Sequence, residues 1–171
     1  LPFRRRDGTL IGTYGISRDI TEWKITEEAM RENLALFRAV FNGSSDAILL
    51  ISEGKLIDCN TRSETMFGYD RAKILTLSPA DISPPLQPDG RPSREASEAY
   101  MRQCDEKGCC RFEWMLQGAD GTTFPSEVSL SCFDFLGKRI VCASVRDIRD
   151  RKKAEEERLE LESRLQLTSK L

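Results

Sequence analysis

The sequence contains no histidine among its 171 residues. A serine or cysteine nucleophile would therefore lack the usual imidazole base, and a histidine-ligated haem is excluded. No phospho-accepting histidine is present either, and there is no glycine-rich phosphate loop of the Walker or dinucleotide-binding type. These absences argue against catalysis, so we expect this segment not to be an enzyme.

The sequence also lacks a long apolar stretch and an excess of positive charge. A membrane-spanning helix needs ~20 apolar residues, whereas the longest run here, at 47–51, has the length of a buried strand. The net charge of −2 provides no basic surface for nucleic acid. Because no signal peptide is visible, we expect a cytoplasmic segment without membrane contact and without a nucleic-acid partner.

The six cysteines form no C-x-x-C pair, and without histidine they cannot complete a common zinc site, so no metal site is expected. Cys104, Cys109 and Cys110 lie close together in the sequence, which leaves an iron–sulfur or redox role open. The others fall in expected strands, where a free cysteine behaves as a small hydrophobic residue. With no secretory signal, we expect reduced thiols. These other cysteines are Cys59, Cys132 and Cys142.

A repeated sequence provides the clearest sign of domain organisation. Arg18-Asp19-Ile20 recurs as Arg146-Asp147-Ile148, and each copy follows an apolar strand-like run and precedes a charged helix. The first copy has too few residues before it to form a domain. We therefore interpret residues 1–20, with an expected strand at 10–16, as the C-terminal strand remnant of a preceding domain; the alternative is a single strand that pairs elsewhere.

Two charged helices flank the central part of the chain. Residues 21–43 form the first, a linker helix that Asp19 or Thr21 can cap. Residues 150–171 form the second, a coiled-coil helix that follows the potential cap Asp147. The first helix has an apolar stripe at i, i+4, i+7 and i+11, which we expect to carry most of the contact in a homodimer. The stripe consists of Met30, Leu34, Phe37 and Phe41.

Between residues 44 and 149 the pattern changes to that of a small mixed domain. It indicates a hairpin, short helices that include 61–67, a longer helix at 93–107 and three further strands. Asn60 is expected to cap the first short helix. Alternation with period two predicts which strand residues point inward. The expected inward residues are Ile48, Leu50, Ile57, Trp114, Val128, Leu130, Val141 and Ala143.

Several short motifs, taken in order and at their spacing, resemble the PAS family. The resemblance covers about residues 37–150 and, through the first copy of the repeat, the first twenty residues or so, whose preceding domain would then also be a PAS domain. The resemblance implies an α+β fold: a five-stranded antiparallel sheet with short helices over one face, flanked by signalling helices. The matching segments are Phe37–Phe41 followed by Ser45–Ile48, Asn60, Met66–Tyr69, Asp120-Gly121, Asp147-Ile148-Arg149 and Asp19-Ile20-Thr21.

The resemblance implies a sensory module that relays a signal to a downstream output domain of the same chain, such as a histidine kinase or a diguanylate cyclase. Flavin-binding light sensors of the family carry a reactive cysteine in an Asn-Cys-Arg-Phe-like helix, whereas this sequence reads Ser78-Pro79-Ala80-Asp81-Ile82 there. Haem-binding members usually use a histidine, which is missing. A non-covalent flavin, another small ligand and a filled core that serves only dimerisation and relay all remain open.

The expected sites follow from this architecture. The module would detect a small ligand or the redox state, and a ligand would lie in the apolar cup between sheet and short helices. The relay would run through the residues where each last strand meets its helix, namely Asp19, Thr21 and Asp147. The expected pocket residues are Phe67, Leu75, Ile82, Tyr100, Phe112, Trp114, Val128 and Leu130.

Overall fold

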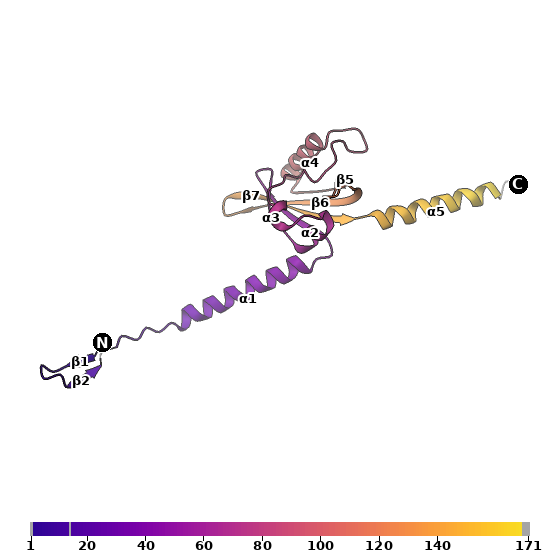
Figure 1. Cartoon of the computed structure of the whole chain (residues 1–171). Coiled ribbons are helices and arrows are strands. Elements are labelled where there is room, and N and C mark those ends of the chain that lie inside the picture. The colour runs from indigo at the N-terminus through magenta and orange to yellow at the C-terminus, as the bar shows by residue number, and fades with distance from the viewer. Residues whose placement is uncertain (1, 14, 169–171) are drawn as a thin grey trace. The chain divides into compact units, whose positions relative to one another are not determined.

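The computed structural model describes residues 2–13 and 15–168 and divides the chain into two compact units, 1–39 and 40–171 (Figure 1). The first unit contains a two-stranded antiparallel hairpin of β1 (Pro2–Arg4) and β2 (Leu10–Thr13). Helix α1 (Thr21–Gly43) begins in this unit and ends in the second. The strand expected at 10–16 ends at Thr13, and Tyr14 lies outside the described residues.

The second unit is built on a five-stranded, fully antiparallel sheet in the order β4-β3-β7-β6-β5. Its strands are β3 (Ala47–Ser52), β4 (Lys55–Cys59), β5 (Cys109–Gln117), β6 (Thr123–Phe135) and β7 (Lys138–Asp147). Helices α2 (Thr61–Phe67), α3 (Arg71–Ile74) and α4 (Ser93–Lys107) share one hydrophobic core with the sheet, and α5 (Arg149–Thr168) follows β7. The expected α+β class and five-stranded sheet are confirmed; residues 169–171 of the expected last helix lie outside the described part of the chain.

Alternation correctly predicted the inward residues of the last three strands. Trp114, Val128, Leu130, Val141 and Ala143 are all buried. The polar residues between them in the sequence fixed the phase of the alternation. One face of the sheet therefore carries the core, as period two requires.

The inward residues predicted for the first hairpin are wrong by one position. Ala47, Leu49 and Ile51 are buried instead of Ile48 and Leu50, because β3 pairs Leu49 with Ala143 on the inner face of β7. In an uninterrupted apolar run, the sequence does not show which alternate residues face the core, so only the pairing with β7 determines the buried face of β3.

Ile57 was also assigned to the wrong face. It is 44% exposed, whereas its neighbour Leu56 is buried. The β3–β4 register shifts between Leu50 and Ile51, and this irregularity rotates the partner strand relative to simple alternation.

Asn60 is fully buried, and its side chain joins the start of the domain to the sheet and to α2. The Oδ1 atom accepts hydrogen bonds from the Ile48 amide (2.9 Å), the Ser63 amide (3.1 Å) and the Ser63 hydroxyl (2.9 Å). The Nδ2 group donates to the carbonyl oxygens of Phe41 (2.9 Å) and Asp46 (3.0 Å). Asn60 is thus the expected N-cap of α2 and also fixes where the α1 segment enters the domain.

We predict that Asn60→Ala lowers the free energy of unfolding of the chain by about 3 kcal/mol, because several buried backbone groups lose their only side-chain partner. Urea denaturation followed by circular dichroism measures the change. Asn42→Ala is the matched control, since Asn42 bonds Thr61 at the exposed start of α2 and should cost at most about 1 kcal/mol. Equal losses in the two variants would contradict the role given to Asn60.

Candidate functional site

A small apolar cavity of about 50 Å³ lies between the inner face of the sheet and the helices. Its wall contains no exposed polar surface and includes Leu49, Met101 and Ala143. Of the eight residues expected to form a pocket, five line it and three do not. The five are Ile82, Phe112, Trp114, Val128 and Leu130.

The three remaining candidates lie elsewhere for identifiable reasons. Phe67 is buried against Phe124, with ring centroids 6.4 Å apart. Tyr100 is partly buried against the core and stacks on Phe112, with ring centroids 3.6 Å apart, but it does not line the cavity. In α3 the neighbouring Ile74 is the fully buried residue, whereas Leu75 is only partly buried.

Trp114 is held rigidly as one wall of the cavity. Its indole Nε1 donates a hydrogen bond to the Ser83 hydroxyl at 2.9 Å, and that hydroxyl donates to the Pro79 carbonyl at 2.8 Å. The Ser126 hydroxyl donates to the Trp114 carbonyl at 2.8 Å. Sequence reasoning missed Ser83, which lies in a proline-rich loop without periodicity and carries no recognisable motif.

A larger polar groove of about 640 Å³ lies next to the apolar cavity. It runs between α4 and the turns of the β3–β4 and β6–β7 hairpins, and its lining includes Arg94, Glu98 and Arg102. Four residues, Ile51, Pro79, Ser97 and Met101, line both spaces and therefore separate them. This groove could not be predicted from the sequence, because its walls come from four distant segments.

The volume of the cavity decides which ligands it accepts. A cavity of about 150 Å³ is needed to hold benzene, and a bound water accounts for about 30 Å³ of liquid volume. The cavity of about 50 Å³ therefore does not fit a flavin or a haem in this conformation. Within residues 2–13 and 15–168, no group of three or more acidic or cysteine side chains is placed to hold a metal ion.

The expectation of six reduced thiols is wrong for two of them. Cys104 of α4 and Cys132 of β6 are joined by a disulfide, with Cα atoms 6.4 Å apart. Cys59, Cys109, Cys110 and Cys142 are free thiols. Burial raises the pKa of the Cys59 thiol to about 11, so it stays protonated at neutral pH.

The junction between β7 and α5 is organised around Asp147. Its carboxylate accepts hydrogen bonds from the Arg149 amide (3.0 Å) and from the Arg149 guanidinium (2.6 Å to Nη2). Partial burial opposes ionisation of Asp147, but the hydrogen bonds from Arg149 outweigh it and lower the pKa of the carboxyl group. The Arg149 guanidinium also lies over the Phe124 ring, 5.3 Å from its centroid.

An ion pair next to this junction connects the first and last strands. The Arg146 guanidinium donates to both carboxylate oxygens of Asp46, at 3.0 and 2.9 Å. The hydrogen bond from Arg146 lowers the pKa of Asp46. The backbone carbonyl of Asp46 also accepts a hydrogen bond from the Asn60 side chain. Asp46, directly before β3, therefore contacts both Asn60 and the end of β7.

The other expected relay residues, Asp19 and Thr21, lie at the start of α1. The Asp19 carboxylate accepts from the Thr21 hydroxyl and from the Thr21 amide (2.9 Å), and these hydrogen bonds lower the pKa of Asp19. Along α1, the stripe residues Met30, Leu34 and Phe37 are 74%, 48% and 52% exposed. Phe41 is half-buried. Within the described part of the chain, no helix combines the length and apolarity needed to cross a membrane.

A single antiparallel sheet with helices on its core face, a small apolar cup and capped helices at the strand exits define a PAS-type domain. A family model described as "PAS domain" matches residues 45–150. The chain therefore belongs to the PAS family. PAS domains are sensory, non-catalytic units that commonly dimerise and occur in multidomain sensors.

Among curated proteins, the chain is 25% identical over 174 residues to the sensor protein FixL of Bradyrhizobium diazoefficiens. The matched region covers 98% of this chain and 33% of that protein. It is 27% identical over 130 residues to a methyl sulfide methyltransferase-associated sensor of Methanosarcina acetivorans, covering 75% of this chain and 12% of that protein. The chain thus spans a third or less of the length of these relatives. Among solved structures, the PAS domain of an HTR-like protein from Haloarcula marismortui is 25% identical with a TM-score of 0.60, covering 73% of this chain and 99% of that one.

We predict that Met101→Ala joins the apolar cavity to the groove and creates a binding space for a small apolar molecule. NMR titration of the protein with benzene checks this, and saturable shifts of core methyl groups are expected in the variant alone. Met66→Ala is the matched control, since Met66 is also half-buried against the core but lines neither space. Identical titrations of all three proteins would show that Met101 does not close the cavity.

Proposed function

We propose that this chain is the sensory and relay segment of a longer multidomain sensor. In this proposal, a change within the PAS domain alters how α5 leaves the sheet and so regulates an output domain such as a histidine kinase or a diguanylate cyclase. The sensed input is a small ligand or the redox state. The relationship to sensors of both bacterial and archaeal origin supports the general role.

One observation carries the relay part of the proposal: the same aspartate hydrogen bond occurs at the start of both flanking helices, directly after β7 and six residues after the end of β2. A hairpin of two antiparallel strands precedes α1, as the β6–β7 hairpin precedes α5. In both junctions the aspartate carboxylate accepts the amide of the residue two positions later, at 2.9 Å for Asp19 and 3.0 Å for Asp147. Because this aspartate hydrogen bond recurs at the start of both helices, we interpret it as part of the coupling between sheet and helix and not as an incidental helix cap.

The repeat also supports a proposed domain order. Residues 1–20 are the last strands of a preceding PAS domain, 21–43 a signalling helix, 44–149 the PAS domain, and 150–171 a coiled-coil helix. In this arrangement α1 carries a signal from one PAS domain to the next, and α5 carries it onward.

Dimerisation would convert a small change at the junction into a defined signal. The exposed stripe Met30, Leu34 and Phe37 on α1 supports a parallel homodimer with its main contact there. Packed helical interfaces adopt discrete alternatives, so a small rotation at Asp147 can switch α5 between two arrangements. The exposed Leu161 and Leu165 supply only a weak stripe on α5, which suits an adjustable segment.

The small cavity favours a second candidate function, a ligand-free PAS domain whose filled core serves only dimerisation and relay. A volume of about 50 Å³ leaves no space for a ligand larger than a few atoms without movement of α4 or its preceding loop. Mass spectrometry of the small molecules that the purified protein releases on denaturation distinguishes the two candidates. A stoichiometric compound supports direct ligand sensing, and its absence supports the filled-core relay.

We predict that Asp147→Ala uncouples the output domain in the full-length protein while the PAS domain stays folded, because the loss of a cap costs only about 1 kcal/mol. The activity of the output domain with and without stimulus measures the coupling. Asp150→Ala, in the exposed first turn of α5, is the matched control and should signal normally. Normal signalling by the Asp147→Ala protein would refute the relay through this junction.

We predict that Phe37→Glu weakens self-association at least tenfold, because it places a charge in the apolar stripe of α1. Sedimentation velocity across a concentration series measures the effect. Leu36→Glu adds the same charge to the same helix at an exposed position outside the stripe and should associate as the wild type does. A wild-type chain that is monomeric at all concentrations would exclude the dimer.

A further inference from the structure

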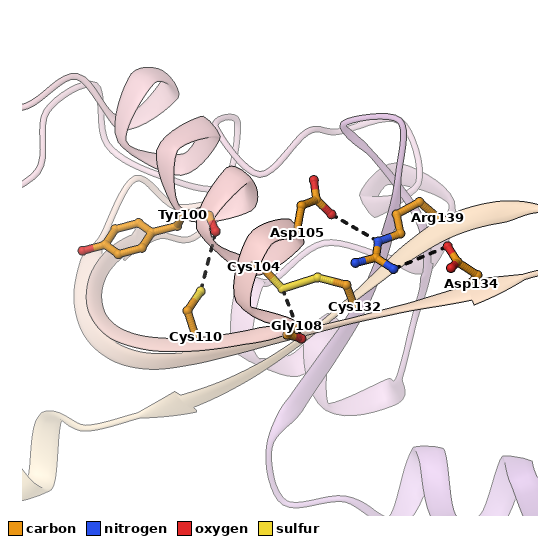
Figure 2. Close-up of a disulfide and its surroundings, with 8 residues drawn as sticks. All are labelled: Tyr100, Cys104, Asp105, Gly108, Cys110, Cys132, Asp134 and Arg139. Atoms are coloured by element: carbon orange, nitrogen blue, oxygen red, sulfur yellow. Dashed lines mark hydrogen bonds and ion pairs between the residues drawn. A yellow bond between two sulfur atoms is a disulfide. The ribbon is translucent and has the colours of Figure 1, made fainter.

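The disulfide connects the last turn of the helix that covers the cavity to the sheet below it (Figure 2). Cys104 lies on the sheet-facing side of α4 and is fully buried, whereas Cys132 on β6 is partly buried. Their Cα separation of 6.4 Å lies within the usual range of about 4.4–6.8 Å for disulfides. The two cysteines are 28 residues apart in the sequence, so only the folded domain brings them together.

Both cysteines are also hydrogen-bonded to Gly108, the residue that ends α4. The Gly108 amide donates to the Cys104 carbonyl at 2.7 Å, and the Cys132 amide donates to the Gly108 carbonyl at 3.0 Å. Gly108 adopts the left-handed conformation, with φ of 81°, that allows the chain to turn directly from α4 into β5. The turn therefore brings Cys104 and Cys132 within reach of each other, so that the bond between their sulfurs can form in the folded domain.

Beside this bond, the C-terminal half of α4 is held on the sheet by Tyr100, which stacks on Phe112 of β5, and by Met101, which is partly buried against the core. The buried residues of the helix are Ser93, Ala96 and Cys104, which are small and bury little apolar area. Arg139 forms ion pairs with Asp105 (3.2 Å) and Asp134 (3.4 Å) beside the disulfide, but all three side chains are largely exposed (Figure 2). Exposed ion pairs contribute little, so the disulfide is the strongest connection between this part of α4 and β6.

The same helix separates the apolar cavity from the polar groove. Ser97 and Met101 of α4 line both spaces. Met101 lies one turn before Cys104, so movement of the last turn of α4 also moves the residue that closes the cavity. The covalent bond thus holds the turn that follows Met101, one of the residues between the apolar cavity and the groove.

The free cysteines near the disulfide indicate that the Cys104–Cys132 bond is reversible. Four free cysteines accompany the disulfide, and one of them, Cys109, is exposed five residues after Cys104. An exposed free thiol so close to a disulfide is unusual in an oxidising compartment, where it would pair or exchange. The domain also has a continuous hydrophobic core from all five strands, so it does not depend on a covalent staple as very small secreted domains do.

We propose that Cys104 and Cys132 form a redox-active disulfide that is made and broken by exchange with low-molecular-weight thiols and disulfides, fixing α4 over the cavity when oxidised and releasing it when reduced. The proposal deepens the sensory function proposed above and rests on it for the link to output. It identifies the sensed input as thiol–disulfide exchange at the Cys104–Cys132 pair.

The exchange is balanced with glutathione as the reagent. In oxidation, one protein thiolate attacks oxidised glutathione and releases one glutathione thiolate. The second protein thiol then attacks the mixed disulfide and releases the other, so the pair loses two electrons and two protons to form two molecules of reduced glutathione. Reduction runs in reverse and begins at Cys132, because Cys104 is fully buried. Burial raises the pKa of the nearby Cys110 thiol, which makes it a poor competitor at neutral pH.

A redox titration of the native chain tests the site itself. The protein is equilibrated over a range of ratios of reduced to oxidised glutathione, alkylated, and analysed by peptide mass spectrometry. We expect Cys104 and Cys132 to become protected together in one two-electron transition within that range. The oxidised protein should melt about 10 °C higher than the reduced one. Two outcomes would overturn the proposal: a pair that is alkylated at every ratio, or a pair that stays oxidised in native protein at the most reducing ratio.

Variants connect the chemistry to the structure. Cys104→Ser and Cys132→Ser should each abolish the transition and the difference in melting temperature. Cys109→Ser is the matched control and should retain both, as should Cys110→Ser. The wild-type titration needs no substitution, so the proposal stays testable if a serine variant fails to fold. A transition that survives Cys132→Ser would transfer the chemistry to another pair and overturn the assignment.

The output of the full-length protein separates this inference from the function on which it rests. If the output of the wild type follows the glutathione ratio and the output of Cys104→Ser does not, both the redox inference and the relay function stand. If output is unaffected by that ratio while Asp147→Ala still abolishes coupling, the redox inference fails and the relay function stands. If neither Cys104→Ser nor Asp147→Ala changes the output, the proposed relay itself is refuted.

Discussion

The buried side chain of Asn60 holds together three segments that the rest of the domain depends on. It caps α2, accepts a hydrogen bond from the Ile48 amide of β3, and is fully buried with its side-chain oxygen and nitrogen paired within the protein. Its two donated bonds go to the carbonyls of Phe41 and Asp46, where α1 ends and the sheet begins. A buried amide satisfied in this way permits one arrangement of these segments, since any other leaves polar groups unpaired.

From this point a continuous set of contacts leads to the other end of the domain. Asp46 forms the ion pair with Arg146 at the end of β7, and the next residue, Asp147, caps α5. The entry of α1 and the exit of α5 are therefore connected through two neighbouring strands, β3 and β7. A change in the sheet has a short structural route to both flanking helices. Helix α4, which contributes Ser97 and Met101 to the wall of the cavity, is the element through which such a change would start.

The sequence was sufficient for features that depend on local chemistry. The N-cap at Asn60 and the alternation around Trp114 each follow from a few neighbouring residues, and the structure contains them. The face of β3 could not be predicted, because five successive apolar residues fit either phase until Leu49 pairs with Ala143. The disulfide and the groove depend on residues that only the tertiary fold brings together. Phe67 and Tyr100 do not line the cavity, because Phe67 packs against Phe124 and Tyr100 stacks on Phe112, and these pairings are not visible in the sequence.

Hydrogen exchange of the wild-type chain under oxidising and reducing conditions tests most directly whether α4 and the helical exit are coupled. The account predicts faster exchange in two places on reduction: the last turn of α4 before Gly108, and the amides of 149–153 at the start of α5. The amides around Asn60 should stay protected in both states, because the connection passes through an intact sheet. Faster exchange confined to α4, with the start of α5 unchanged, would contradict the coupling.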